Sequence, residues 1–211
     1  MLKKYIKRIF SWKKTLIIIT SLGIILGLGY SFTKNVEYKA ESSLLILPRT
    51  TIGVDAYSAI KTAERLGENL IQILYTSSFF QQVQNTDYDI DYSYFKLDNK
   101  EDFKTQWSNM ISAYMKYNTG IMVISVYHQD KEQAILISQA INEIFIHHNS
   151  EYLSYEGFVK IKMIDEPYTE NWPARPKFII NALTSGFILL LISIFIIIIT
   201  STEFKNNFNN L

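Results

Sequence analysis

The chain contains no cysteine, and only four prolines and eight glycines occur among its 211 residues. Without cysteine it can form no disulfide framework, and it has no thiolate to act as a nucleophile or a metal ligand. The sequence also lacks a Walker A motif, a GxSxG nucleophile elbow and an HExxH zinc motif, so it carries no recognised catalytic signature. We therefore expect no enzyme activity and no cofactor.

Charge is nearly balanced overall but is unevenly distributed along the chain. The formal net charge is +1. Residues 1–14 carry six lysines and arginines and no acid, whereas residues 33–177 carry 14 basic and 19 acidic side chains, a net of −5. A nucleic-acid-binding protein would carry its basic patch on the folded part. The acidic body therefore argues against nucleic acid as a partner.

Two long stretches have no charged residue. They are the 18-residue run Thr15–Phe32 and the 23-residue run Phe178–Thr200. A 23-residue helix is about 34 Å long, which exceeds the roughly 30 Å hydrocarbon core of a bilayer. We predict transmembrane helices at 15–33 and 178–200. The alternative for the first is a cleaved signal peptide, against which the apolar run is long and no small-x-small cleavage site follows it.

These helices divide the chain into six segments. The segments are a basic cytoplasmic arm (1–14), the first transmembrane helix (15–33), an extracytoplasmic domain (34–166), a proline-rich collar (167–177), the second transmembrane helix (178–200) and a cytoplasmic tail (201–211). Basic residues beside the first helix favour a cytoplasmic N-terminus, so we expect both termini inside a bacterial plasma membrane. The expected anchors at the lipid interface are Trp12, Trp172, Arg175 and Lys177.

The stretch between the two helices predicts one α+β domain. Alternating apolar residues predict strands at 36–47 and 158–165, and two β-prone runs flank Asn118-Thr119-Gly120, which predicts a β-hairpin with Gly120 at positive φ. The expected helices begin at Asp55, near Thr76, near Asn99 and at Asp130, the last with a capping box that includes Gln133. We summarise the order as β-α-α-β-β-α-β, a small mixed sheet with helices on one face.

Two groups of side chains have the composition of metal sites. They are His128, Asp130, His147 and His148 in one group and Asp87, Asp89 and Asp91 in the other. Adjacent histidines on a helix point about 100° apart, so His147 and His148 are poorly placed to share one ion. The aspartate group lacks the glycine and the distal glutamate of a calcium loop. We expect no metal at either group.

Two further features concern the membrane segments. Gly23 and Gly27 have the GxxxG spacing that lets two membrane helices pack closely, although glycine is also common in membrane helices without such a role. Pro167, Pro173 and Pro176 lie within ten residues of the chain. Each proline fixes its own φ and restricts the residue before it, so the collar is expected to end the last strand and delay the second membrane helix. The alternative is an ordinary linker.

The whole arrangement resembles the chain-length determinant family, the Wzz-type polysaccharide co-polymerases. It is similar to short members without a fused tyrosine kinase, such as capsular polysaccharide membrane proteins of Gram-positive bacteria. The matching segments are VEYKAESSLLIL at 36–47, TGIMVISVYHQDKEQAILISQAINEIF at 119–145 and VKIKMIDEPYTENWPARPKFIINAL at 159–183. The long extended helices of the family are not evident here, and the tail has neither a tyrosine cluster nor a Walker box.

The resemblance implies a non-enzymatic regulator that forms homo-oligomers in the plasma membrane. Such proteins set the length of a capsule, exopolysaccharide or O-antigen by acting on a membrane polymerase, in some systems together with a separate cytoplasmic tyrosine kinase. The alternative from another class is a two-helix extracytoplasmic sensor or ligand-binding protein. That alternative predicts a cytoplasmic output domain, and about eleven residues follow the second helix.

Overall fold

The computed structural model describes residues 11–48, 55–95, 100–149, 152 and 159–208. The chain divides into two compact units, with boundaries between Asn35 and Val36 and between Ala174 and Arg175. We call the unit made by the two ends of the chain the helical hairpin, and the unit between the boundaries the sheet unit. Each is described by itself.

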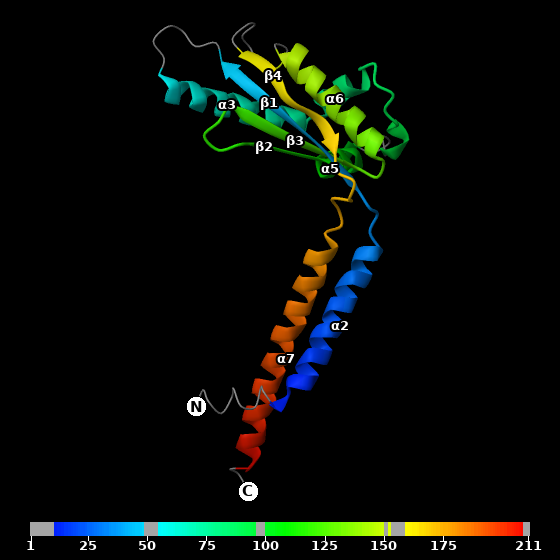
Figure 1. Ribbon diagram of the computed structural model, residues 1–211, viewed down its shortest axis with the longest axis vertical. Helices are drawn as coiled ribbons and strands as arrows, with labels where there is room; N and C mark the ends of the chain where they lie inside the picture. The colour runs from blue at the N-terminus through cyan, green and yellow to red at the C-terminus, as the bar shows by residue number, and fades with distance from the viewer. Residues whose placement is uncertain (1–10, 49–54, 96–99, 150–151, 153–158, 209–211) are drawn as a thin grey trace. The chain divides into compact units, whose positions relative to one another are not determined.

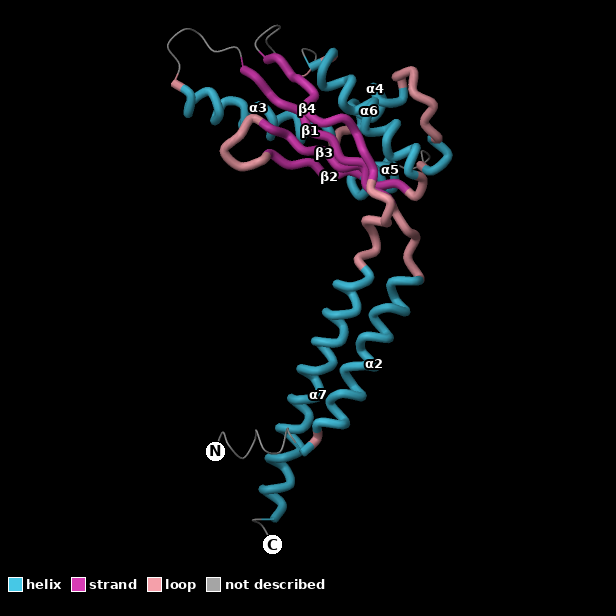
Figure 2. Tube along the Cα trace, viewed as in Figure 1, coloured by secondary structure: helices cyan, strands magenta, loops and turns pink. Residues whose placement is uncertain are grey.

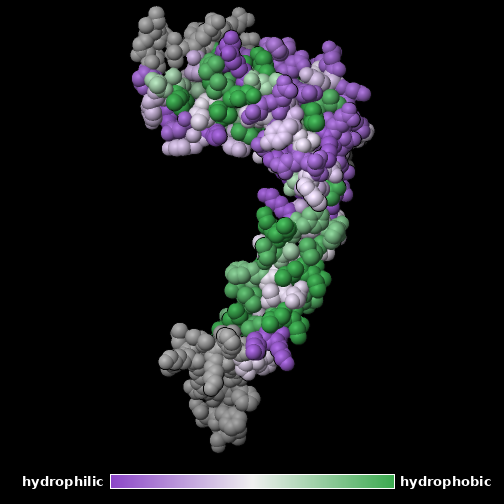
Figure 3. All heavy atoms as spheres, in the orientation of Figure 1, coloured by the Kyte–Doolittle hydropathy of each residue, from purple (hydrophilic) through white to green (hydrophobic). Residues whose placement is uncertain are grey.

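The helical hairpin consists of α2 (Lys13–Phe32) and α7 (Phe178–Phe208), which lie side by side and run antiparallel (Figure 1). Both are long and apolar enough to cross a membrane. The visible surface of the pair is predominantly hydrophobic (Figure 3). The helix of α7 continues beyond Thr200 to Phe208, into the segment predicted as a tail.

The sheet unit is an α+β structure built on a four-stranded sheet of order β2-β3-β1-β4 (Figure 2). The strands are β1 (Tyr38–Pro48), β2 (Ile111–Met115), β3 (Ile121–His128) and β4 (Val159–Thr169). Every neighbouring pair is antiparallel, so the prediction of a mixed sheet is wrong. Parallel neighbours would require a βαβ crossover that brings the chain back in the same direction. In this sheet each strand instead lies beside a strand that runs in the opposite direction.

One more helix precedes the β-hairpin than the predicted order contained. The helical elements are α3 (Ala56–Leu74), α4 (Ser77–Gln84), the 3₁₀ turn η1 (Tyr92–Tyr94), α5 (Lys100–Met110) and α6 (Lys131–His147). The helix that the summarised order left out is α5, which was expected to begin near Asn99 and which buries Phe103, Trp107 and Met110 at helical spacing. The order β-α-α-β-β-α-β is therefore corrected to one with α3, α4 and α5 between the first two strands.

Helices α3 and α6 cover the same face of β1. Gly67 of α3 lies against Ile46, and Asn142 of α6 accepts a hydrogen bond from Ser42. Ser42 and Ile46 are four residues apart on the strand and so point to one face. The alternate positions, such as Leu45 and Leu47, stay partly exposed on the other face.

A cluster of aromatic side chains fills the core beneath α4 and α5. The Phe80 ring lies 4.4 Å from the Phe103 ring and 5.0 Å from the Trp107 ring, centroid to centroid. The Trp107 indole donates a hydrogen bond of 2.8 Å to the Leu74 carbonyl, so its polar atom is satisfied although the residue is 1% exposed. Burial of each such side chain contributes about 1.5–3 kcal/mol to stability.

The first and last strands of the unit are neighbours, so its two ends lie together. β1 pairs with β4 along most of its length, and the Ala174 amide donates a hydrogen bond of 2.8 Å to the Glu37 carbonyl. The chain thus leaves the unit beside the point at which it enters. This arrangement suits a domain whose two ends both continue into helices of one hairpin.

Pro167 lies inside β4, and the prediction that the strand ends before it is wrong. Proline lacks the amide that a central strand would need, but β4 is an edge strand and its pairing with β1 shifts register opposite Glu41 and Ser43. An edge position with a bulge accommodates the ring. The collar predicted at 167–177 therefore begins within the sheet.

Candidate functional site

Gly23 and Gly27 lie at the closest approach of α2 to α7, and both are buried. A β-carbon at Gly23 would lie 2.9 Å from the Ser185 carbonyl oxygen. One at Gly27 would overlap the Ser185 hydroxyl and lie 2.6 Å from the Asn181 carbonyl oxygen. In the structure, the partner of this glycine face is therefore α7 of the same chain.

Polar side chains join the two helices beside these glycines. The Ser185 hydroxyl donates a hydrogen bond of 2.5 Å to the Gly23 carbonyl. The Asn181 amide donates one of 3.0 Å to the Ser31 hydroxyl, which in turn donates to the Gly27 carbonyl at 3.0 Å. Between helices surrounded by hydrocarbon, no water is present to satisfy polar side chains, so these side chains bond across the interface. Because each bond joins one particular residue of α2 to one of α7, the bonds fix the register of the two helices.

The residues of α7 that receive α2 were not identified from the sequence. Ala182 and Gly186 are buried, and a β-carbon on Gly186 would lie 2.8 Å from the Ile24 side chain. Their spacing is the small-xxx-small pattern, which is visible in the run 178–200. The matching pattern on both helices is the feature that could have predicted the pairing.

The collar residues lie on both sides of the unit boundary. Trp172 belongs to the sheet unit and is 82% exposed. Pro173 is half-buried and precedes the boundary, whereas Arg175, Pro176 and Lys177 follow it. Trp12, the other predicted anchor, precedes α2 and is 47% exposed.

His128 and Asp130 have structural partners of their own. The Asp130 amide donates to His128 Nδ1 at 3.0 Å, and the imidazole packs edge-on against Tyr94 at 4.9 Å. The Asp130 carboxylate caps α6 by accepting from the Glu132 amide at 2.8 Å. Among the described residues, no group of three histidine, cysteine or acidic side chains is arranged to hold a metal ion.

Gln133 does not complete the predicted capping box. Its side-chain oxygen accepts from the Asp91 amide at 2.8 Å, and its nitrogen donates to the Asp89 carbonyl at 3.2 Å. Asp91 caps η1 by accepting from Ser93, and these hydrogen bonds lower the pKa of the Asp91 carboxyl. The acidic segment, residues 87–91, is thus hydrogen-bonded to α6 through the backbone atoms of Asp89 and Asp91.

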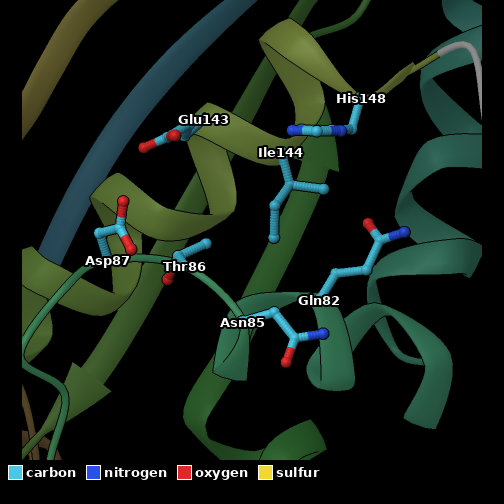
Figure 4. Close-up of a pocket in the computed structure, with 7 residues that line it drawn as sticks. All are labelled: Gln82, Asn85, Thr86, Asp87, Glu143, Ile144 and His148. Atoms are coloured by element: carbon cyan, nitrogen blue, oxygen red, sulfur yellow. The ribbon is translucent and has the colours of Figure 1, made fainter.

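A hollow of about 230 Å³ lies between α4 and α6 (Figure 4). It is lined from the α4 side by Gln82, Asn85, Thr86 and Asp87 and from α6 by Glu143, Ile144 and His148. In Figure 4 the Glu143 carboxylate points away from Gln82 and His148, toward the other side of α6. The lining is rich in amide and carboxylate groups, which suit a hydrogen-bonding ligand.

A comparison with models of known protein families finds no match to this chain, and a comparison with curated protein sequences finds none either. The relationship to polysaccharide co-polymerases therefore stays a proposal.

Proposed function

We propose that this protein is a non-enzymatic polysaccharide co-polymerase that regulates the chain length of a surface polysaccharide. It would lie in the bacterial plasma membrane with α2 and α7 spanning the bilayer, both termini in the cytoplasm and the sheet unit outside. Its expected partners are further copies of itself, a membrane polysaccharide polymerase and, in some systems, a separate tyrosine kinase.

The observation that carries the proposal is the pairing of the first and last elements within each unit. α2 packs on α7 through Gly23 and Gly27, and β1 pairs with β4. A single extracytoplasmic domain held between two packed membrane helices is the plan of the family that the sequence resembles. The catalytic motifs sought in the sequence are absent from it.

The helix packing also refines how copies would associate. The glycine face of α2 is covered by α7, so it is not free to contact another copy. Association between copies would then use the sheet unit and the lipid-facing sides of the helices. The basic residues before α2 and the exposed Lys177 at the end of the collar would meet lipid headgroups.

The test is deletion of the gene in its own host, followed by gel electrophoresis of the surface polysaccharide. We expect a lost or shifted modal length, restored by the wild-type gene. An unchanged length distribution would refute the proposal. A variant with Pro173 and Pro176 replaced by alanine should insert normally but alter polymer length, because the collar would no longer be stiff.

The alternative, a two-helix ligand-binding membrane protein, is favoured by the polar hollow between α4 and α6. It predicts that a small ligand changes the behaviour of a separate cytoplasmic partner. Under this alternative the deletion leaves polysaccharide length unchanged, so the same experiment separates the two functions.

A further inference from the structure

Three polar side chains lie in the apolar interface between β1 and α6. Ser42 and Ser138 are fully buried and Asn142 is 2% exposed. The Ser42 hydroxyl donates to the Asn142 side-chain oxygen at 3.1 Å and lies 3.3 Å from the Ser138 hydroxyl. Burying polar groups costs free energy that apolar residues would not incur. What the trio achieves is to hold the Asn142 amide in one orientation.

The nitrogen of that amide is left with a poor acceptor. Its partner is the Met163 thioether of β4, at 3.8 Å. Sulfur in a thioether accepts weakly, and one thioether cannot satisfy both N–H groups of an amide. Among the described residues, the side-chain nitrogen of Asn142 thus has only this weak acceptor for its two N–H groups.

Asn142 and Met163 both line a hollow between α6 and β4 with a volume of about 340 Å³. This volume lies within the roughly 300–1,000 Å³ range of small-molecule sites. A ligand oxygen in the hollow could accept the hydrogen bond that Asn142 cannot make within the protein. The buried amide therefore points to an occupant.

The rest of the lining defines the chemistry of that occupant. Gln139 and Glu143 contribute from α6, Glu166 from β4, and Tyr88 from the acidic segment. No lysine or arginine is among the described residues that line the hollow, and the one imidazole there is that of His147. An anionic ligand would meet two carboxylates against that single imidazole. A ligand with several hydroxyl groups can donate to the carboxylates and accept from the amides.

Glu143 also lines the hollow between α4 and α6, so the two hollows adjoin across one side chain. Burial raises the pKa of Tyr88, and its hydrogen bond to the Glu143 carboxylate raises it further, so the phenol stays protonated. A protonated phenol is both donor and acceptor. Each hollow has one histidine and no lysine or arginine among its described lining residues, so the two hollows have the same preference.

We propose that the hollow between α6 and β4 binds a neutral, hydroxyl-rich sugar unit. The Asn142 amide donates to a sugar oxygen, and the Glu143 and Glu166 carboxylates accept from sugar hydroxyls. The identification of that sugar as part of a growing polymer rests on the proposed function. The binding itself rests on the lining and on the buried amide.

Saturation-transfer NMR on the full chain in lipid nanodiscs tests the proposal directly. The probes are maltose, lactose and N,N′-diacetylchitobiose as neutral sugars, glucuronic acid and glucose 6-phosphate as anions, and spermidine as a cation. We expect transfer to at least one neutral sugar and none to the anions. Absence of transfer to every neutral sugar, or equal transfer to the anions, overturns the proposal. Preferential binding of spermidine also overturns it, because the site would then recognise cationic amines.

Matched variants locate the binding on α6. Glu143→Gln keeps the shape of the side chain but removes its charge, and should weaken sugar binding about tenfold or more. Glu132→Gln makes the same change on an exposed part of α6 that lines neither hollow, and should leave binding unchanged. Asn142→Ala reports on the buried amide, with circular dichroism to show that the variant folds. Should it fail to fold, Gln139→Ala replaces it. Equal binding by wild type and Glu143→Gln would refute this location.

The sugar site and the proposed function can fail separately. Sugar binding without any change of polymer length on gene deletion would leave the site standing and refute the co-polymerase. A changed length on deletion without sugar binding would do the reverse.

Discussion

A methyl group added to Gly27 has no room between α2 and α7. It would overlap the Ser185 hydroxyl and lie 2.6 Å and 3.1 Å from backbone atoms of Asn181 and Ala182. Backbone atoms cannot turn aside as a flexible side chain can, so the helices must move apart. Gly29 on the same helix has no atom within 4 Å of its added methyl, which makes Gly29→Ala the matched control.

The cost of Gly27→Ala can be worked from the contacts that the separation breaks. Two side-chain hydrogen bonds between the helices are at risk, from Ser185 to Gly23 and from Asn181 to Ser31. Such bonds contribute about 0.6 kcal/mol on average and up to about 1.7 kcal/mol in membranes, so together they amount to about 1–3 kcal/mol. Alanine favours a helix over glycine by about 1 kcal/mol, but this gain is common to both variants and cancels in the comparison.

The assay uses the absence of native cysteine. Phe32 and Phe178, whose rings lie 5.4 Å apart across the helices, are replaced by cysteine and spin-labelled in the full chain in nanodiscs. We expect dipolar broadening in the otherwise unaltered hairpin and in Gly29→Ala, and reduced broadening in Gly27→Ala. Equal spectra for the two alanine variants would show that the glycine contact does not hold the helices together.

Two predictions concern the sheet unit. Asp55 caps α3, and its hydrogen bonds with Ser58 lower the pKa of the carboxyl. Because the folded pKa lies below the unfolded one, this stabilisation is present above the unfolded pKa and is lost as pH falls through the folded pKa. Melting curves from about pH 5 to pH 2 should therefore show a smaller loss of Tm in Asp55→Asn than in wild type; identical slopes would count against the cap. Asn118 has a φ of 55°, so Asn118→Gly should keep the Tm of the wild type. Asn118→Val should lower the free energy of unfolding by about 1–2 kcal/mol and therefore lower the Tm. Equal melting of the two variants would contradict the assigned turn.

The α+β character and the two apolar end helices follow from local patterns in the sequence. Alternation in the segment 36–47 and the uncharged runs need no tertiary information. The antiparallel sheet does, because the pairing of β1 with β4 joins segments more than a hundred residues apart. Helix α5 was expected near Asn99 but left out of the summarised order, because it bears few apolar residues in a polar stretch; its packing on the sheet, rather than its amphipathic pattern, decides its place.

The β-hairpin turn shows where composition misleads. Gly120 was expected at positive φ, but Asn118 is the residue with that conformation. Asparagine tolerates the left-handed region, and the backbone N–H of Asn118 donates a hydrogen bond of 2.6 Å to the Glu64 carboxylate. Gly120 is needed for a different reason, since a β-carbon there would lie 2.7 Å from the Ile46 carbonyl oxygen. A close approach of this kind cannot be predicted before the neighbouring strand is placed.

The helical hairpin illustrates the same limit for the membrane segments. The GxxxG spacing on α2 indicated a close contact but not its partner, because another copy and α7 satisfy the pattern equally well. Ala182 and Gly186 supply the complementary small residues on α7. Their alignment with Gly23 and Gly27 requires the two helices to run antiparallel at one register, and that register depends on the polar contacts of Ser31 and Ser185.

The candidate sugar site was absent from the sequence interpretation because each of its buried polar residues is unremarkable alone. Ser138 and Asn142 interrupt the apolar face of α6 at a spacing of four, and Ser42 interrupts the inward face of β1. A single polar residue on such a face is usually accommodated by a local hydrogen bond. Three that meet across about a hundred residues of sequence make a buried hydrogen-bonded network, which no single element of the sequence reveals. Asn142 is the member whose side-chain nitrogen is directed at the β4 side, and the weak acceptor that it meets there is the argument for a ligand.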